Sequence, residues 1–226
     1  MLDIQLIEPF RMEPAQLDAF LALGWFRMHQ TVFTTEGLNI DSKMFPVIWL
    51  RVRLGDFEVG RTYRSIKKRN GHLRMEIQKA VITRQHALLF ESYKENVSFE
   101  IAPSLEWLLY GNSYRDIYNT YVVNVFDQNK LIGAGFFDLG LQSAAGITSI
   151  FDPAYKKYSI GKYMIYEKML YCKNENFSFF YPGYFVPGYF RFDYKLEIGR
   201  SAVEYFRKDT NEWLPLRDWE QRSRLS

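Results

Sequence analysis

The segment Asp152–Tyr163, DPAYKKYSIGKY, combines groups that could position a reacting carbonyl or an anion. A strand-like run ends at Asp152, and a helix is predicted to begin near Ser159 and to run to Cys172. Free backbone N–H groups and the helix dipole at such a start can hold an acceptor oxygen or an anion. Gly161 would let a ligand approach the backbone closely. A simpler interpretation stays open, in which Ser159 caps the helix and Gly161 serves packing.

A second segment, Phe179–Lys195, is rich in aromatic residues and contains two Pro-Gly pairs, at Pro182 and Pro187. A Pro-Gly pair inside a strand-like run favours a bulge or a splayed edge, where backbone groups are free for a ligand. The tyrosines of this segment could stack on a base or position a reacting amine. Core packing with turns is the alternative, and it accounts best for the phenylalanines.

A third segment, residues 61–74, is strongly basic and carries no acidic residue. Its cationic residues are Arg61, Arg64, Lys67, Lys68, Arg69 and Arg74. Neutralising several phosphates needs this local density of charge, and Tyr63 could add stacking. The alternative is an ordinary solvated face.

The whole chain narrows these possibilities. It has 226 residues, 47% of them apolar and 18% aromatic, so it can bury a substantial core in one or two domains. A net charge of +3 is too small to name a nucleic-acid partner by itself. One cysteine and three scattered histidines offer no zinc-ligand spacing. No nucleophilic triad, carboxylate pair or Walker loop is present.

The same features predict a cytoplasmic protein that is not bound to a membrane. Cys172, predicted on a helix, cannot form an internal disulfide, which fits a reducing compartment. The residues Met1–Gln5 show no charged region followed by an apolar stretch, and no run approaches the ~18 apolar residues that span a bilayer.

The predicted elements indicate an α+β fold. Helices are expected at 14–24, 84–97, 103–111, 159–172 and 200–207, and strands at 45–52, 73–82, 121–126, 130–138, 145–151 and 177–185. Three antiparallel strands, a crossover helix and a further strand are typical of a GNAT-like acyltransferase fold with a mixed, mainly antiparallel sheet. We divide the chain into a small N-terminal subdomain, 1–83, and a transferase domain, 84–226.

The order and spacing of these segments resemble the arginyl/leucyl-tRNA–protein transferase family, over roughly residues 20–196. The early part of the resemblance is Gly24-Trp25-Phe26-Arg27, Pro46–Val52 with Phe57, and Arg64–Asn70. The later part is Asp152, Pro153, Tyr155, Ser159, Gly161 and Tyr163, then Tyr181, Gly183, Tyr184, Tyr194 and Lys195.

The resemblance implies an enzyme that moves an amino acid, of the Arg or Leu class, from aminoacyl-tRNA to the α-amine of a protein or peptide N-terminus with an acidic first residue. It implies catalytic roles for Asp152, Ser159, Gly161 and Tyr181. It places substrate contacts at Trp25, Arg27, Tyr155, Gly183, Tyr184, Tyr194 and Lys195. Arg61, Arg64, Lys67, Lys68 and Arg69 would hold the tRNA.

Two stretches depart from the family pattern. The family's cysteine cluster is replaced by Thr34–Phe45, which has no cysteine, and its "HSCPK" stretch by Pro187–Arg191. We therefore expect no metal and no cofactor, with aminoacyl-tRNA as the co-substrate. The ester is already activated, so the protein mainly has to position the reactants and hold the oxyanion and the proton.

Two alternatives remain open at this stage. A GNAT-type N-acyltransferase that uses acyl-CoA would bind the phosphates of CoA before the 159–172 helix, although the usual phosphate-loop motif is incomplete there. A non-catalytic homologue would bind tRNA or N-terminal degrons without transfer.

Overall fold

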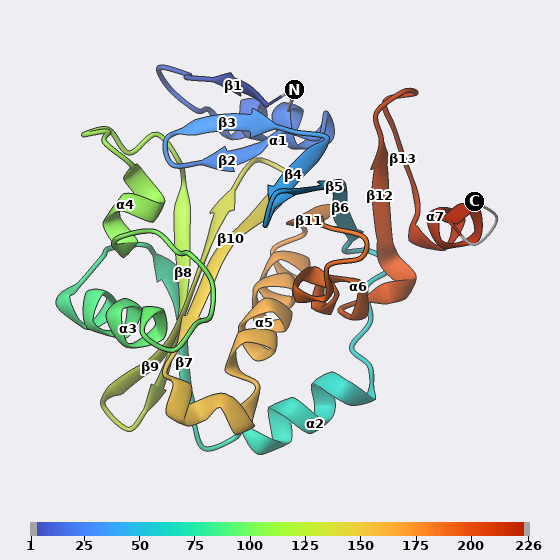
Figure 1. Ribbon diagram of the computed structural model, residues 1–226. Coiled ribbons are helices and arrows are strands. Elements are labelled where there is room, and N and C mark those ends of the chain that lie inside the picture. Colours follow the sequence, from blue (N-terminus) through green and yellow to red (C-terminus); the bar gives the residue numbers. More distant parts are fainter. Residues whose placement is uncertain (1–3, 224–226) are drawn as a thin grey trace.

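The computed structural model describes residues 4–223 and is organised around one eight-stranded sheet (Figure 1). The strand order is β13-β12-β6-β11-β10-β9-β8-β7. The strands are β6 (Ile48–Arg53), β7 (Arg74–Lys79), β8 (Thr120–Asp127), β9 (Lys130–Leu139), β10 (Ser143–Phe151), β11 (Phe179–Phe185), β12 (Val203–Arg207) and β13 (Glu212–Pro215). Strands β10 and β11 run parallel and the other neighbours antiparallel, which confirms the predicted α+β class with a mixed, mainly antiparallel sheet.

Helices cover both faces of this sheet. The helices are α1 (Pro14–Ala22), α2 (Arg61–Arg69), α3 (Arg84–Lys94), α4 (Leu105–Tyr110), α5 (Ile160–Asn174), α6 (Tyr194–Glu197) and α7 (Leu216–Ser223). Val123 of β8 packs in the core that contains Met164 of α5, whereas Val122 packs with Phe90 of α3. Since successive strand residues point to opposite faces, α5 and α3 lie on opposite sides of the sheet. None of these described helices is long and apolar enough to cross a membrane.

The N-terminal residues build two small sheets beside the large one. One has the order β1-β3-β2, with β1 (Gln5–Ile7), β3 (Thr31–Thr34) and β2 (Phe26–Met28), and the other pairs β4 (Gly37–Ile40) with β5 (Lys43–Pro46). Helix α1 begins at Pro14 as expected, and Gly24 after its end has a φ of 74° that favours glycine. Strands β6 and β7, which precede residue 83, belong to the large sheet, so this sheet contains residues from both sides of the predicted subdomain boundary.

The crossover that defines the fold is also present. Strands β8, β9 and β10 form an antiparallel meander, the 3-10 helix η1 (Pro153–Tyr158) leads into α5, and β11 returns parallel to β10. This is the arrangement expected of a GNAT-like acyltransferase fold. Cys172 lies buried on α5.

The predicted helix at 200–207 is wrong. Arg200–Ala202 is a short 3-10 turn, η3, and Val203–Arg207 is β12, which pairs with both β6 and β13. Valine and aromatic residues favour a strand, and the turn at residues 208–211 makes β12 and β13 a hairpin. A second 3-10 turn, η2 (Phe190–Phe192), precedes α6.

A buried ion pair ties the N-terminal sheet to the large one. Arg27 of β2 contacts Asp138 of β9 at 2.8 Å, and the two side chains are 1% and 0% exposed. The guanidinium also donates to Thr120 Oγ1 and to the carbonyl oxygens of Leu109 and His29. The Arg27 side chain, which the family resemblance predicts to contact substrate, is thus engaged in contacts within the protein.

Replacing Arg27 with methionine should therefore destabilise the fold by about 3–5 kcal/mol, because it leaves the buried Asp138 charge uncompensated. Chemical denaturation followed by circular dichroism measures this loss. Arg53→Met is the control, since Arg53 and Asp56 are about half exposed, and Glu204, the second partner of Arg53 at 3.5 Å, keeps Arg51 at 2.6 Å; it should cost less than about 1 kcal/mol. Equal losses in the two variants would contradict the structural role of Arg27.

Candidate active site

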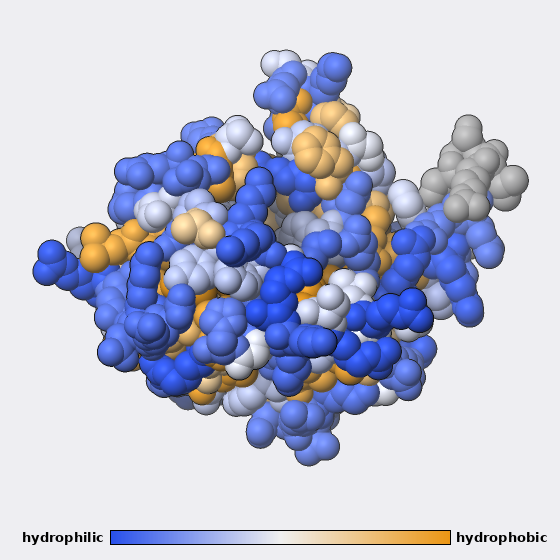
Figure 2. All heavy atoms as spheres, turned by 90° about the horizontal axis from the view of Figure 1, so that it is seen from below, coloured by the Kyte–Doolittle hydropathy of each residue, from blue (hydrophilic) through white to orange (hydrophobic). Residues whose placement is uncertain are grey.

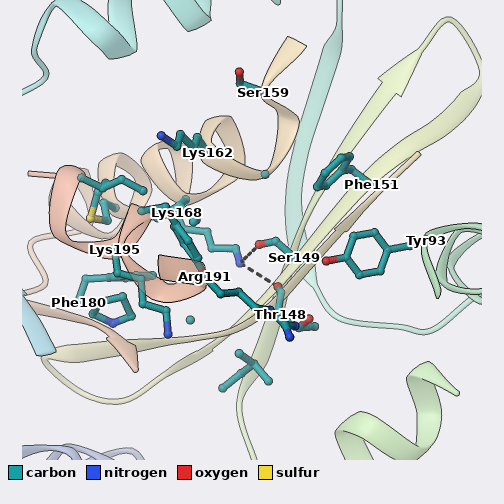
Figure 3. Close-up of a pocket in the computed structure, with 18 of the residues that line it drawn as sticks. Tyr93, Thr148, Ser149, Phe151, Ser159, Lys162, Lys168, Phe180, Arg191 and Lys195 are labelled. Atoms are coloured by element: carbon teal, nitrogen blue, oxygen red, sulfur yellow. Dashed lines mark hydrogen bonds between the residues drawn. The ribbon is translucent and has the colours of Figure 1, made fainter. Parts of the chain in front are cut away.

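The candidate site is a cavity of about 610 Å³ at the point where β10 and β11 separate (Figure 3). The two strands share only the register pairs from Ser143–Phe179 to Ala145–Tyr181. Beyond them, the consecutive residues Gly146–Ser149 of β10 all line the cavity. Successive strand residues point to opposite faces of a sheet, so a cavity on one face would be lined by every second residue. Lining by four consecutive residues means that the cavity lies along the free edge of β10.

Local sequence explains why the strands separate. A Cβ on Gly146 would lie 3.0 Å from the Phe180 ring, so glycine at this position leaves room for that ring. Both strands then become irregular, β10 between Gly146 and Thr148 and β11 between Phe180 and Gly183. Pro182, which has no N–H to donate, lies in the second irregularity and lines the cavity. The predicted splayed edge at Pro182-Gly183 is present.

The walls of the cavity come from both faces of the sheet. Tyr93 of α3 and Leu108 of α4 line it on one side, and Ile165 and Met169 of α5 on the other. The cavity thus passes through the sheet at the separation. A site of this kind can hold two reactants that approach from different sides.

The first turn of α5 forms part of the rim. Ser159 occupies the N-cap position of α5 with a left-handed φ of 57°, but its side chain makes no capping hydrogen bond. Ser159, Gly161 and Lys162 line the cavity, and a Cβ on Gly161 would lie 3.4 Å from the Phe151 ring. The predicted catalytic pair Ser159 and Gly161 therefore lies at the site.

Lys168 of α5 extends into the cavity wall from the face of the sheet that α5 covers. It is 1% exposed, and its Nζ lies 3.0 Å from Phe136 O, 3.1 Å from Thr148 O and 3.1 Å from Ser149 Oγ (Figure 3). Burial lowers the pKa of Lys168 to about 7. A Cβ on Gly135 would lie 2.9 Å from this nitrogen, so glycine leaves the space that the amino group occupies.

Two further cations line the same cavity. Lys195 donates to Tyr184 O at 2.7 Å, and burial lowers the pKa of this lysine to about 7. Arg191 stacks on the Phe99 ring, and its charge opposes the burial that raises the pKa values of Tyr93 and Tyr194. Among the described residues that line the cavity there is no aspartate or glutamate.

Two predicted site residues, Asp152 and Tyr155, lie outside the cavity lining. Burial alone would raise the pKa of Asp152, but hydrogen bonds from Lys130 Nζ (2.6 Å) and the Ala154 N–H (2.9 Å) lower it. Tyr155 donates to Asp127 Oδ2 at 2.6 Å, which raises its pKa to about 12. Asp152 caps η1 and thereby positions the loop that leads into α5.

The predicted aromatic residues of β11 divide between the two faces of the sheet. Phe180 lines the cavity, whereas Tyr181 is 3% exposed and packs with Ala145 in the core on the other face. Tyr184 packs edge-on against Trp49. Gly183 has a φ of 87°, and a Cβ there would lie 3.4 Å from Lys195 Nζ. Of the β11–α6 predictions, Tyr194 and Lys195 line the cavity itself.

Trp25, the remaining predicted substrate contact, packs edge-on against Phe20 and does not line the cavity. No group of three metal-binding side chains occurs within residues 4–223.

The predicted tRNA-binding stretch is an amphipathic helix, α2. Tyr63 and Ile66 are buried, whereas Arg61, Arg64, Lys67, Lys68 and Arg69 are exposed. Tyr63 donates to Glu167 Oε1 at 2.7 Å, so its predicted stacking role is wrong. Hydrophilic residues cover most of the surface seen from below, the side on which α2 lies (Figure 2).

Helix α2 is joined to the loop that leads to the cavity. Arg69 donates to Lys157 O at 2.7 Å, and Asn70 Nδ2 donates to Tyr158 O at 3.0 Å. These bonds place the exposed Lys156 and Lys157 of η1 next to the basic end of α2. The basic surface, defined as the five cations of α2 with Lys156 and Lys157, thus continues along the chain to the rim of the cavity.

The polar cavity residues that sequence reasoning missed include Ser149, Lys168 and Arg191. A signal for Lys168 was present, since its spacing from Met164 and Cys172 places it on the buried stripe of α5, where a lysine without a carboxylate partner is unusual. Arg191 lies in Pro187–Arg191, the stretch that departs from the family pattern. Ser149 gave no signal, because its role depends on which strand edge is free.

A sheet opened between two parallel strands, with a helix start at its rim, defines an acyltransferase-type site. The family pattern described as "Arginine-tRNA-protein transferase, C terminus" matches residues 83–204, more than half of the chain. The chain belongs to this family. It is an aminoacyl-tRNA–protein transferase, an enzyme that moves an amino acid from aminoacyl-tRNA to a protein N-terminus.

Curated relatives agree with this assignment. An aspartate/glutamate leucyltransferase of Helicobacter hepaticus is 24% identical over 80% of this chain and 76% of its own length. A protein of the same name from Leptospira interrogans is 25% identical over 76% of this chain and 69% of its own. One from Paracoccus denitrificans is 27% identical over 74% of this chain and 64% of its own.

Similar solved structures include L-PGS from Bacillus licheniformis, with a TM-score of 0.47, 10% identity, and coverage of 77% of this chain and 51% of that one. Another is the ribosomal-protein-S18-alanine N-acetyltransferase from Escherichia coli, with a TM-score of 0.35, 13% identity, and coverage of 46% and 63%.

The lowered pKa of Lys168 predicts a pH-dependent stability. The unfolded lysine titrates near pH ~10.4 and the folded one near 7, so between these values the unfolded chain binds more protons and stability rises with pH. The gain in the free energy of unfolding is at most about 1.4 kcal/mol per pH unit. Lys168→Met should remove this contribution. In urea denaturation, the free energy of unfolding of the wild type minus that of the variant should therefore grow between pH 7 and 8.5. A pH-independent difference would contradict the assignment.

Proposed function

We propose that the enzyme transfers leucine from leucyl-tRNA to proteins whose N-terminal residue is aspartate or glutamate. The observation that carries the proposal is the composition of the cavity, whose described lining includes the cations Arg191 and Lys195 but no carboxylate. An acidic side chain would be attracted to these cations. The guanidinium of an arginyl donor would be repelled, whereas a leucine side chain can pack on Ile147, Ile165 and Met169.

The names of the curated relatives support the same donor and acceptor. The reaction is an ester aminolysis, in which the neutral α-amine attacks the aminoacyl carbonyl and the tRNA ribose oxygen leaves. Because the ester is already activated, we propose that no cofactor takes part besides aminoacyl-tRNA. We place the enzyme in the cytoplasm, where charged tRNA is available.

The roles at the site follow from its geometry. The N–H groups of the α5 first turn, at Ser159–Gly161, would face the carbonyl oxygen of the ester. Arg191 and Lys195 would bind the carboxylate of the acceptor residue, because both lack a carboxylate partner of their own in the described structure. Tyr194 would line the acceptor side. Asp152 and Tyr155 would act indirectly, by holding the loop before α5.

The donor tRNA would bind along the basic surface of α2 and η1. This surface leads along the chain to the cavity rim, so phosphates could be held outside while the charged 3′ end enters between β10 and β11. Its exposed lysines and arginines suit contacts to the phosphate backbone.

The function is tested by mixing the protein with a panel of charged tRNAs and peptides that begin with Asp, Glu, Asn or Gln. Transfer of labelled leucine to the Asp and Glu peptides is expected, and transfer from none of the tRNAs would refute the proposal. Arg191→Met or Lys195→Met should lower kcat/KM for the Asp peptide by about 10- to 100-fold, the loss of one charged hydrogen bond. Transfer to the Asn peptide should fall less, because that peptide has no side-chain carboxylate whose charged hydrogen bond is removed.

Lys162→Met is the matched control for this experiment. Lys162 also lines the cavity, but its Nζ lies 2.6 Å from Glu197 Oε2, so its charge is already paired. This variant should keep the preference for Asp over Asn. If it abolished the preference as fully as Arg191→Met, the acceptor carboxylate would not be read by the two unpaired cations.

The tRNA surface is tested by the salt dependence of binding. The quadruple variant Arg64→Ala, Lys67→Ala, Lys68→Ala and Arg69→Ala should bind more weakly, and the slope of log K against log salt should fall by up to about 3. The control removes four exposed cations elsewhere: Lys43→Ala, Arg53→Ala, Lys79→Ala and Lys208→Ala. Filter binding with leucyl-tRNA at several salt concentrations measures both. Identical slopes in the two variants would show that α2 is only a solvated face.

A further inference from the structure

The proposed aminolysis needs a group that accepts a proton, and the described cavity lining offers no carboxylate for it. The attacking amine carries one proton too many once its nitrogen has bonded to the carbonyl carbon. General bases of this kind contribute about 10²- to 10⁴-fold to a rate. A path for this proton must therefore run through the other polar groups of the cavity walls.

Ser149 lies between the cavity and Lys168. It lines the cavity from the free edge of β10, and its Oγ is 3.1 Å from Lys168 Nζ (Figure 3). Lys168 forms part of the cavity wall but is only 1% exposed, whereas Ser149 is partly exposed, so the serine is the member of the pair that a substrate meets first. The serine hydroxyl is the side-chain partner that connects the buried amine to the reactants.

The contacts of Lys168 suit both of its protonation states. As an ammonium it donates three hydrogen bonds, to Phe136 O, Thr148 O and Ser149 Oγ. As a neutral amine it still donates two, to the carbonyls, and its lone pair accepts the third from the Ser149 hydroxyl. Neither state leaves a buried group without a partner, so the proton can arrive and depart without rearrangement of the core.

Lys195 does not offer the same path. Its Nζ donates to Tyr184 O, and its charge lies 5.2 Å and 5.1 Å from the centroids of the Tyr184 and Phe192 rings. Aromatic faces stabilise an ammonium, which suits binding of an anion. No hydroxyl is interposed between this amine and the cavity in the contacts of the described residues.

We propose that Ser149 and Lys168 form a proton relay that takes the proton from the attacking α-amine and returns it to the departing ribose oxygen. This inference rests on the proposed aminoacyl transfer and assigns its acid–base step. Ser149 touches the reacting nitrogen and is the catalytic residue. Lys168 acts through Ser149 and is a positioning and proton-storing residue.

The proton relay conserves every atom and electron pair. The nitrogen of the neutral amine bonds to the ester carbonyl carbon, and the carbonyl π electrons move to the oxygen. An N–H proton moves to Ser149 Oγ while the serine proton moves to Lys168 Nζ. The oxyanion then re-forms the carbonyl, the C–O bond to the ribose breaks, and the protons move back so that the ribose oxygen leaves as a hydroxyl. Amine and ester become amide and alcohol.

The pair Ser149→Thr and Ser149→Val isolates the hydroxyl. The two variants have almost the same shape, and β-branched residues suit a strand, so folding should be alike. Single-turnover transfer from leucyl-tRNA to an Asp peptide should stay within about 10-fold of wild type in the threonine variant and fall about 10²- to 10⁴-fold in the valine variant, with little change in KM. Comparable rates in the two variants would overturn the relay.

Lys168→Met tests the second member. Alone it should slow the same step about as much as Ser149→Val, and the double variant should be no slower than either single one, because both remove one pathway. Multiplicative losses would show that Lys168 acts independently of Ser149 and would overturn the relay. If Lys168→Met does not fold, as thermal unfolding would reveal, the threonine and valine pair still decides. Wild-type protein that transfers nothing would refute the proposed function instead.

Discussion

The early separation of β10 from β11 is the constraint on which the rest of the structure depends. Parallel neighbours normally continue their pairing, but here pairing ends at Ala145–Tyr181, where Gly146 and Pro182 make both strands irregular. An open edge inside a sheet exposes backbone groups that need partners. The protein covers this edge with α5 on one face and with residues of α3 and α4 on the other, which encloses a cavity rather than a core.

Lys168 helps to stabilise that opening. Its amino group supplies a donor to Thr148 O, at the part of β10 that no longer pairs with β11, and to Phe136 O of β9. Gly135 provides the space beside it. A buried lysine without a carboxylate is costly, so its presence is more easily explained by a role at the site than by stability alone. Arg27, in contrast, has its charge matched by Asp138 and fixes the N-terminal sheet.

The sequence was sufficient for the elements with a clear period, such as the β8–β9 hairpin, the crossover helix and β11. It was insufficient where the outcome depends on a distant partner: β12 became a strand because it pairs with β6 and β13, and Arg27 meets a carboxylate 111 positions away. Motif spacing also cannot say which face of a strand a residue takes. Hence Ser159, Gly161 and Lys195 line the cavity, whereas Tyr181 packs in the core on the other face of the sheet.

The cations of the site also bear on the protonation state of the attacking α-amine. An α-amine is a nucleophile only when it is neutral, and nearby cations disfavour its protonated form. The cations proposed to bind the acceptor carboxylate, Arg191 and Lys195, would therefore also help the adjacent amine to lose its proton before attack. The carboxylate of an acidic first residue would raise the pKa of the amine and so oppose the effect of the two cations. This opposition is smallest when the carboxylate is bound to Arg191 and Lys195 and lies away from the amine. Recognition of the acceptor and activation of its amine would then depend on the same two side chains.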